Sequence, residues 1–354
     1  MRPTSEAELS EIIRSAGPVQ IRGGGTRQIG RSAATVLQTA GLSGVELYEP
    51  GALTLVAKAG TPVADVQALL ATERQRLAFE VPDLRRLLAR DGASTLGGVV
   101  AANASGPRRV QVGACRDALL GVRFVDGLGC VVKNGGRVMK NVTGYDLVKL
   151  LAGSHGSLGV LTEVSFKVQA IPEAEITLAA NLPLAEGLAA LRKALASPYD
   201  ISGAAWAAGR AMIRLEGMAG SVAYRAGQLR ALLGFDETAA DWAALRDVTA
   251  FAYRPGAVWR LSLKPTEAAR LVTGLGLEAI CDWGGGLVWL LDPTGTADVR
   301  GAVAGNGHAT LMRPLPGMAA VPVFSPEADA VAALTAGLRA KFDPRGMFNP
   351  GMMA

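Results

Sequence analysis

The chain has 354 residues, of which 49% are hydrophobic and 19% are charged, a composition typical of a soluble globular enzyme. Its net charge of +5 is spread without runs of Lys or Arg, which argues against a nucleic-acid-binding surface. No apolar run approaches the roughly 20 residues that a membrane span needs, and the N-terminus does not begin a secretory signal. The sequence therefore predicts a cytoplasmic protein of two domains, or of one large domain with an insertion.

The cysteines and histidines are few. Cys115, Cys130 and Cys281 are widely spaced and include no Cys-x-x-Cys pair. This pattern favours buried, reduced thiols over a disulfide, a zinc site or an iron–sulfur cluster. With only His155 and His308 in the chain, no metal site is expected.

The first predicted element is a helix that begins after Ser5, which forms a candidate capping box with Glu8. Gly17 and Pro18 end this helix, and residues 19–22 then alternate between apolar and polar as a short strand does. That strand leads directly into three consecutive glycines.

The three glycines, residues 23–25, lack every Cβ, so successive backbone N–H groups can converge on one anion. Arg22 and Thr26 flank them with a cation and a hydroxyl donor. A phosphate or pyrophosphate fits such a loop, and a flexible glycine-rich turn without a ligand is equally compatible with this motif alone. Neither of the common phosphate-loop patterns is present.

A buried strand at 53–59 and a helix after Thr61-Pro62 precede a segment, 93–106, built almost wholly of small residues. Its two glycine clusters would let the backbone approach a flat, bulky group closely, with Asn103 and Ser105 as polar contacts. Tight packing between helices is the structural alternative for this segment.

Residues 119–125 and 130–132 are predicted to form a hairpin, and a short helix is predicted at 145–152. A second glycine-rich turn, 153–159, leads into a strand at 160–168 in which every second residue is apolar or Thr. This strand ends the first block of the sequence at Pro172.

The block from about 175 to 312 alternates strands and helices in an order that recurs loosely, which indicates an α+β sheet covered by helices. Strands are predicted at 176–180, 204–208, 211–216, 258–263, 279–283, 286–291 and 309–312. Helices are predicted at 183–196, from the end of the strand at 211–216 to residue 233, and at 266–275. A last helix is predicted at 327–341.

Four separated segments occur together in a characteristic order and spacing. They are 22–26, the Gly-Gly and Asn-x-Ser-Gly of 95–106, the Gly-Ser-x-Gly-x-Leu-Gly-Val-Leu-Thr-Glu-Val of 153–164, and the Phe-Asp-Pro…Phe-Asn-Pro-Gly of 342–351. Together they resemble the flavoproteins with a para-cresol methylhydroxylase-type FAD domain, the vanillyl-alcohol oxidase superfamily. The resemblance is close over the first 172 or so residues and the tail, and extends to the middle only in general architecture.

Within that superfamily, the sequence is most similar to the FAD-binding subunits of bacterial glycolate oxidase. The similarity includes the Ser-Gly-Pro-Arg-Arg of 105–109 and the Arg-Val-Met-Lys-Asn-Val-Thr-Gly-Tyr-Asp of 137–146. It implies an α+β fold with a two-part FAD-binding domain of vanillyl-alcohol oxidase type and an α+β cap domain. Residues 1–172 would form the FAD-binding domain, 173–312 the cap on the substrate side, and 313–354 a C-terminal segment returning to the FAD domain.

The resemblance also implies a place for each motif around FAD. The cofactor would be bound noncovalently, because the glycine loop lacks the histidine to which some relatives attach it. The glycine loop would hold the pyrophosphate of FAD, and residues 95–106 would line the flavin and ribityl chain. Residues 159–161 would run past the adenine end of the cofactor. The implied cofactor-binding residues are Arg22, Gly23, Gly24, Gly25, Thr26, Thr95, Gly97, Gly98, Asn103, Ser105, Gly106, Gly159, Val160 and Leu161, with Asn349 near the flavin.

The leading functional hypothesis is an FAD-dependent oxidoreductase, as the noncovalent FAD-binding subunit of a heteromeric glycolate oxidase (dehydrogenase). Glycolate would be oxidised to glyoxylate and electrons passed to partner redox centres, in the cytoplasm or at a membrane through the partner subunits. Relatives that oxidise 2-hydroxy acids carry paired histidines and an acidic residue late in the cap, which this chain lacks. The resemblance therefore implies a larger FAD-containing catalytic subunit and an iron–sulfur subunit as partners, and leaves the catalytic residues of this chain unknown.

Two alternatives stay open. The chain could be a self-sufficient FAD-dependent 2-hydroxy-acid dehydrogenase with Arg260, Lys264 or Arg313 on the substrate carboxylate, although ordinary surface charge explains each of these residues more simply. It could instead be a non-catalytic scaffold, and the intact glycine loop argues against a form that has lost FAD. His155 is expected to be a turn residue bonded to backbone near the cofactor, and His308 to open the last cap strand.

Overall fold

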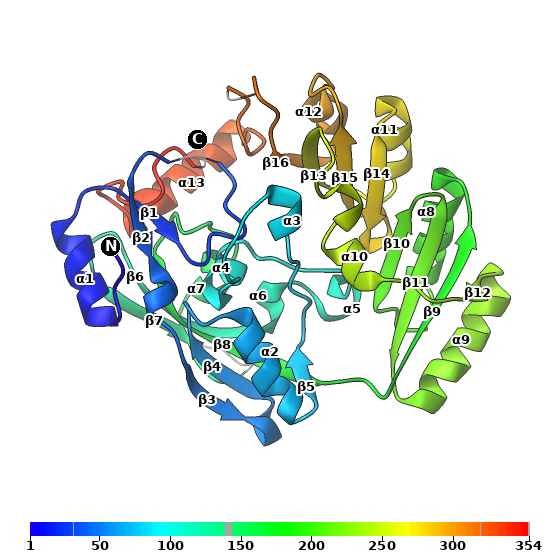
Figure 1. The fold of residues 1–354 in the computed structure, drawn as a ribbon, viewed down its shortest axis with the longest axis horizontal. Coiled ribbons are helices and arrows are strands. Elements are labelled where there is room, and N and C mark those ends of the chain that lie inside the picture. Colours follow the sequence, from blue (N-terminus) through cyan, green and yellow to red (C-terminus); the bar gives the residue numbers. More distant parts are fainter. Residues whose placement is uncertain (31, 139–143, 319, 353–354) are drawn as a thin grey trace.

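The computed structural model describes residues 1–30, 32–138, 144–318 and 320–352. Its strands form one sheet of two strands, one of six and one of eight. Figure 1 shows the two larger sheets on opposite sides of the molecule, with short helices between them. Within the described ranges, no helix is both long and apolar enough to cross a bilayer.

The N-terminal helix α1 (Glu6–Ser15) begins as predicted, because Ser5 Oγ accepts a hydrogen bond from Glu8 N at 3.2 Å. The predicted capping box is wrong in its second half, since the Glu8 carboxylate accepts from Thr4 N and Thr4 Oγ1 at 2.8 and 3.1 Å. Leu9 and Ile13 are fully buried on the inner face of the helix.

The strand before the glycine loop, β1 (Val19–Arg22), pairs in parallel with β2 (Thr35–Gln38), which the sequence did not predict. The C-terminal tail returns to the same place, because Val19 N donates to Met347 O and Asn349 N donates to Val19 O. The beginning and the end of the chain therefore form one small unit (Figure 1).

The six-stranded sheet is antiparallel throughout and has the order β3-β4-β8-β6-β7, with β5 added to β8. The predicted hairpin is confirmed, with Val125 opposite Val131. Phe79, Phe124 and Phe166 are fully buried in its core. The strands are β3 (Val45–Glu49), β4 (Thr54–Lys58), β5 (Gln75–Leu77), β6 (Leu119–Val125), β7 (Val131–Gly135) and β8 (Val160–Ala170).

The helices of this half are short apart from α2 (Val63–Thr72), which the sequence predicted. The other helices are α3 (Arg85–Leu88), α4 (Leu96–Ala101), α5 (Arg109–Val112), α6 (Cys115–Ala118) and α7 (Leu147–Leu151), with 3₁₀ turns η1 (Thr39–Gly41) and η2 (Pro50–Ala52). Residues 139–143 of the 137–146 motif lie outside the described residues.

The eight-stranded sheet is antiparallel and contains every strand predicted between 175 and 312. Its order is β12-β9-β11-β10-β14-β15-β13-β16. The strands are β9 (Ala174–Asn181), β10 (Gly203–Ala207), β11 (Arg210–Gly217), β12 (Asp236–Glu237), β13 (Ala257–Leu263), β14 (Glu278–Asp282), β15 (Leu287–Asp292) and β16 (Gly307–Arg313).

The two faces of this sheet are covered differently. Helices α8 (Leu184–Leu195), α9 (Ala219–Leu233), α11 (Ala268–Leu275) and α12 (Val299–Val303) contribute to the core on one face. The other core joins Trp242 of α10 (Trp242–Arg246) and Trp289 of β15 to Leu84 and Leu87 of the first half of the chain. The two halves thus share apolar contacts.

The remaining elements are η3 (Thr249–Phe251), η4 (Trp283–Gly285) and α13 (Asp329–Phe342).

The predicted domain boundary at residue 172 falls between β8, which belongs to the six-stranded sheet, and β9, which belongs to the eight-stranded sheet. The three-part division itself stays a prediction.

The prediction for the cysteines is correct for Cys115 and Cys281, which are buried, and wrong for Cys130, which is exposed. Cys130 lies in the turn of the hairpin, directly before β7, and not in either strand.

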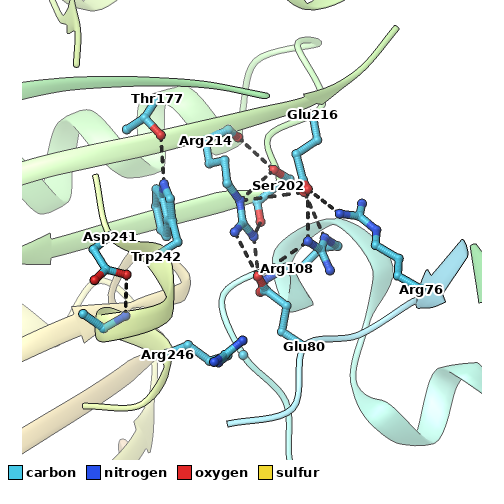
Figure 2. A network of polar contacts seen from close by, with 12 residues as sticks. Arg76, Glu80, Arg108, Thr177, Ser202, Arg214, Glu216, Asp241, Trp242 and Arg246 are labelled. Atoms are coloured by element: carbon cyan, nitrogen blue, oxygen red, sulfur yellow. Dashed lines mark hydrogen bonds and ion pairs between the residues drawn. The ribbon is translucent and has the colours of Figure 1, made fainter. Parts of the chain in front are cut away.

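A cluster of buried charges joins the two sheets (Figure 2). Arg214 Nη1 donates to Glu80 Oε1 at 2.9 Å, and Arg108 Nε donates to Glu216 Oε2 at 2.9 Å. Arg76 Nη1 adds a contact to Glu216 Oε1 at 2.6 Å. We call these five residues the ion cluster. Burial by itself would raise the pKa of Glu216, but the hydrogen bond and charge of Arg108 and the charge of Arg214 lower it to about 2.

Replacing Glu216 by Gln is expected to lower the free energy of unfolding at pH 7 by about 3 kcal/mol, because the buried Arg108 would keep only Glu80, at 3.5 Å, as a counter-charge and the partly buried Arg76 would lose its carboxylate partner. Since the pKa of Glu216 is depressed from 4.5 to about 2 on folding, its contribution should be complete above pH 4.5 and should disappear as the pH falls towards 2. Urea unfolding of both proteins between pH 7 and pH 2 checks this.

The control is Glu278→Gln, which breaks an exposed ion pair with Arg254. This variant should unfold almost as the parent protein does, because exposed ion pairs contribute little. Equal destabilisation by the two substitutions, or a Glu216 effect independent of pH, would contradict the assigned role of the ion cluster.

Candidate cofactor-binding site

The glycine loop lies against the segment that starts at residue 92, so closely that side chains are excluded. A Cβ on Gly24 would lie 1.5 Å from Ala93 O, and one on Gly23 would lie 2.4 Å from Thr95 Oγ1. Gly25 has a φ of +74°, a backbone conformation that favours glycine. The absence of side chains at 23–25 is thus required by the fold itself.

This loop lines a cavity of 90 Å³, the loop cavity. Its walls also include Thr95 and Gly98 at the start of α4 and His155 of the second glycine-rich turn. Thr95 caps α4, because its Oγ1 accepts a hydrogen bond from Gly98 N at 3.4 Å. Three of the four sequence motifs therefore meet around one cavity.

A second cavity of 100 Å³, the interface cavity, adjoins the loop cavity, and the two share Arg27, Ile29, Ala102 and His155. On one side it is lined by the small residues 102–106. On the other side it is lined by residues of the eight-stranded sheet and its connections: Leu245, Arg246, Arg260, Asp282, Leu287, Trp289, Thr310 and Met312. The two cavities therefore lie side by side, one against the glycine loop and the other between Ser105 and the second sheet.

There are also two broader clefts, one of 820 Å³ away from both cavities and one of 680 Å³ that shares Ile29 with both of them. Neither is lined by the three glycines or by residues 102–106. Because the sequence motifs converge on the two smaller cavities, we take those as the candidate site.

The loop cavity contains cationic groups that lack anionic partners. Arg22 Nε and Arg27 Nε are buried and have no hydrogen-bond partner among the described residues. The other nitrogens of Arg27 donate to neutral oxygens of Thr26, Ser94 and Pro82. Burial lowers the pKa of Arg27 to about 10, which leaves its guanidinium charged at neutral pH.

This donor set fits the pyrophosphate of FAD, since buried cations and side-chain-free amides are what a polyphosphate requires. The small residues 102–106 fit a flat ring system in the same way. The cavities are smaller than the 300–1,000 Å³ or so typical of ligand pockets, so binding a molecule as large as FAD requires their walls to move apart.

His155 connects the two cavities and is held by backbone bonds, as predicted. Its N–H donates to Ala101 O at 2.8 Å, and its carbonyl accepts from Asn349 Nδ2 at 2.8 Å. Its ring packs against Phe324, with 5.1 Å between centroids. Burial, with a smaller effect of Arg260, lowers the pKa of His155 to about 4, so the ring is neutral at physiological pH. His308 lies exposed on β16 and lines neither cavity.

The charged groups of the interface cavity differ in their partners. Arg246 is paired with Asp247 through two bonds of 2.7 and 2.8 Å. The side chain of Arg260 makes no ion pair or hydrogen bond with any described residue. Its guanidinium carbon lies 5.6 Å from the centre of the Trp283 ring. Asp282 accepts a hydrogen bond from Trp283 N at 2.7 Å, and burial raises its pKa to about 7.

The structure brings most of the predicted site residues together. Those that line one of the two cavities are Arg22, Gly23, Gly24, Gly25, Thr26, Thr95, Gly98, Asn103, Ser105 and Gly106. Gly97 packs instead on Ala59, which a Cβ would approach to 2.9 Å.

The other predicted residues lie away from the cavities. Val160 and Leu161 are buried in the apolar cores, and a Cβ on Gly159 would lie 2.6 Å from the Phe124 ring. Asn349 uses its amide to hold two segments, because its Oδ1 accepts from Ile21 N at 2.7 Å and its Nδ2 donates to His155 O. Contact of these four residues with the cofactor stays a prediction.

Sequence reasoning missed Arg27 and Asp282 and gave Arg260 no preference over Lys264 and Arg313. A usable pattern was present in each case. Arg27 directly follows the Gly-Gly-Gly-Thr motif, and Arg260 and Asp282 are charged residues in or at the end of strands that are otherwise largely buried. A charge inside a buried strand indicates a special environment.

Comparisons with known proteins show the family to which the chain belongs. A family model described as "FAD binding domain" matches residues 1–135. The chain is 35% identical to the glycolate oxidase subunit GlcE of Escherichia coli (strain K12) over 351 residues, which is 98% of this chain and 95% of that protein. It is 31% identical to the glycolate oxidase subunit GlcD of Bacillus subtilis (strain 168) over 186 residues, 50% of this chain and only 38% of that protein.

Among solved structures, an alkyldihydroxyacetonephosphate synthase superposes with a TM-score of 0.67 over 99% of this chain and 76% of its own, at 16% identity. That likeness concerns the fold. Fold, site and family model together define a flavoprotein with an FAD-binding domain of the para-cresol methylhydroxylase type. Within this class, the chain belongs to the family of the glycolate oxidase subunit GlcE.

Replacing Gly24 by Ala is expected to weaken FAD binding at least tenfold, because the new Cβ would force the loop away from Ala93 O and disturb the amides around the cavity. Titration of the cofactor-free protein with FAD, followed by flavin fluorescence, gives the affinity. Gly17→Ala is the matched control, since a Cβ there meets nothing within 4 Å. Unchanged FAD affinity in a folded Gly24→Ala protein would show that the loop is not the phosphate site.

Proposed function

We propose that this chain binds one FAD noncovalently along the loop and interface cavities and serves as the FAD-binding subunit of a heteromeric glycolate oxidase (dehydrogenase). The observation that supports this most directly is the pair of neighbouring cavities, one lined by the side-chain-free glycine loop with its unpaired guanidinium nitrogens and the other by the small residues 102–106. Identity to a named glycolate oxidase subunit over nearly the whole chain supports the activity.

In this proposal the glycine loop holds the pyrophosphate. The amides of residues 23–25, together with Arg22 and Arg27, neutralise its charge, and residues 102–106 lie beside the ring system. When bound, FAD supplies a hydride acceptor for oxidation of the glycolate CH–OH group. The apolar side chains of Leu287, Trp289 and Met312 on the opposite wall exclude water from that side.

The proposed partners are a larger FAD-containing catalytic subunit and an iron–sulfur subunit, and association with a membrane through those partners is part of the same proposal. Support comes from GlcE of Escherichia coli, which matches 98% of this chain and is itself named as a subunit of glycolate oxidase. A second candidate function, oxidation of a 2-hydroxy acid by this chain alone, is favoured by the position of Arg260 and Asp282 in the interface cavity.

The purified chain is expected to be yellow and to release all of its FAD when denatured with acid, at about one FAD per chain, because the glycine loop has no histidine for a covalent bond. The absorbance of supernatant and pellet after precipitation checks this. A coloured pellet would contradict noncovalent binding, and a colourless protein that takes up no added FAD would contradict the cofactor assignment.

Co-expression with the two candidate partner subunits should yield a complex that reduces an added electron acceptor with glycolate, whereas the flavin of this chain alone should stay oxidised, without bleaching, when glycolate is added. Rapid bleaching of the isolated chain by glycolate would instead establish the second candidate. Failure to co-purify with any such partner would contradict the role as a subunit.

A further inference from the structure

Arg260 is the unusual charge of the interface cavity. It extends from the middle of β13, where Val258, Trp259 and Leu261 are buried. Its guanidinium lies over the Trp283 ring, and that of Arg109 lies over the same ring at 4.3 Å. Trp283 is itself fixed, because its Nε1 donates to Gly106 O at 3.1 Å. Cation–π contacts therefore hold Arg260 in place without neutralising it.

No described carboxylate neutralises this charge. The ion pairs of the described residues engage neither Arg260 nor Asp282. Burial, and to a lesser extent the charge of Arg109, lowers the pKa of Arg260 to about 10, so it stays protonated at neutral pH. A cation in such surroundings is costly unless an anion joins it.

The rest of the cavity favours a small anion. Arg27 adds a second cation, Arg246 is neutralised by Asp247, and His155 is uncharged. Of the described residues that line this cavity, Asp282 alone carries a carboxyl group. Apart from Asp282 and Thr310, the remaining wall on the side of the second sheet is formed by Leu245, Leu287, Trp289 and Met312, so Arg260 is the cation of this wall that a small carboxylate can pair with.

The other two candidate cations have different tasks. Arg313 donates to the backbone carbonyls of Gly256, Leu87, Phe251 and Arg254, so its guanidinium is fully engaged in holding loops. Lys264 is exposed and lines neither cavity. Arg260 also does not line the loop cavity, so the pyrophosphate site is not the place of its anion.

We propose that the interface cavity is a binding site for a small carboxylate anion in this chain itself, with Arg260 as the anchoring cation and Trp283 as the residue that positions it. The proposal rests on the proposed function in that FAD occupies the space beside residues 102–106 and leaves the Arg260 side to the carboxylate. The chain then recognises a 2-hydroxy acid or its 2-oxo product directly, wherever the oxidation takes place.

The test uses the full chain loaded with FAD. Oxalate, which cannot be oxidised by loss of a hydride, is titrated by calorimetry and by the change in the visible flavin spectrum. Glycolamide, which replaces the carboxylate of glycolate by a neutral amide, is the matched ligand control. The parent protein should bind oxalate, and Arg260→Met should weaken this binding about 10- to 100-fold, as expected for loss of a charge-assisted contact.

Arg260→Lys should give an intermediate affinity, because it keeps the charge but loses the planar fork. If Arg260→Met fails to fold, the oxalate affinity of Arg260→Lys decides whether Arg260 binds the carboxylate. Arg254→Met, which removes an exposed guanidinium paired with Glu278, should bind oxalate as the parent does. Equal binding of oxalate and glycolamide, or unchanged oxalate affinity in both Arg260 variants, would overturn the proposal.

Two further results separate this proposal from the proposed function. A variant of Arg260 that loses FAD while its oxalate affinity is unchanged would make the residue a cofactor contact and overturn the carboxylate site. A chain that takes up no FAD would refute the proposed function, and calorimetry of the FAD-free protein with oxalate would then decide the role of Arg260 by itself.

Discussion

The contact on which the site depends is the one between the two sheets, and the ion cluster fixes it. Glu80 accepts from Arg214 of β11 and from the backbone N–H of Arg108, and its own carbonyl accepts from Gly106 N. Glu80 thus holds a strand of the eight-stranded sheet through its carboxylate and the end of the small-residue segment through its backbone carbonyl. Because the interface cavity is lined from both sides of this junction, its shape is set by charges that lie outside it. Figure 2 shows how these side chains converge.

Four of the non-glycine residues with positive φ lie in or next to the site. Asn103, His155, Trp283 and Asn349 all have φ between 44° and 54°, which is uncommon for residues other than glycine. Asn103 and His155 line the cavities, Trp283 orients Arg260, and Asn349 holds the turn that contains His155. Each conformation is maintained by hydrogen bonds to other segments, as for Asn103, whose Oδ1 accepts from Arg116 N at 3.0 Å. These hydrogen bonds fix the backbone of individual wall residues, although the walls themselves must move apart to admit FAD.

Much of this fold could be predicted from the sequence, because hydrophobic periodicity and glycine are local properties. The strands of the second sheet and the hairpin β6–β7 are examples. The short strands β2 and β12 were missed, since each is only a few residues long and depends on its partner strand. The glycine loop and 95–106 were recognised as a site because they need particular backbone conformations, which glycine and small residues reveal.

The charges of the site could not be predicted in the same way. Arg260, Arg313 and Lys264 look alike in the sequence, and only tertiary contacts decide that Arg313 is bonded to carbonyls, Lys264 is in solvent and Arg260 is without a described partner. The hydrogen bonds of Asn349 could not be predicted either. Its amide joins Ile21 N to His155 O, and its contact with the cofactor stays a prediction.

The return of the tail to β1 has a consequence for how the protein is made. Phe348 bridges to Val19, and Asn349 clamps the strand that enters the glycine loop. During synthesis the loop precedes these supports by more than three hundred residues. The cradle proposed for the phosphates is therefore complete only once the segment that contains Phe348 and Asn349 has been made and has packed against β1.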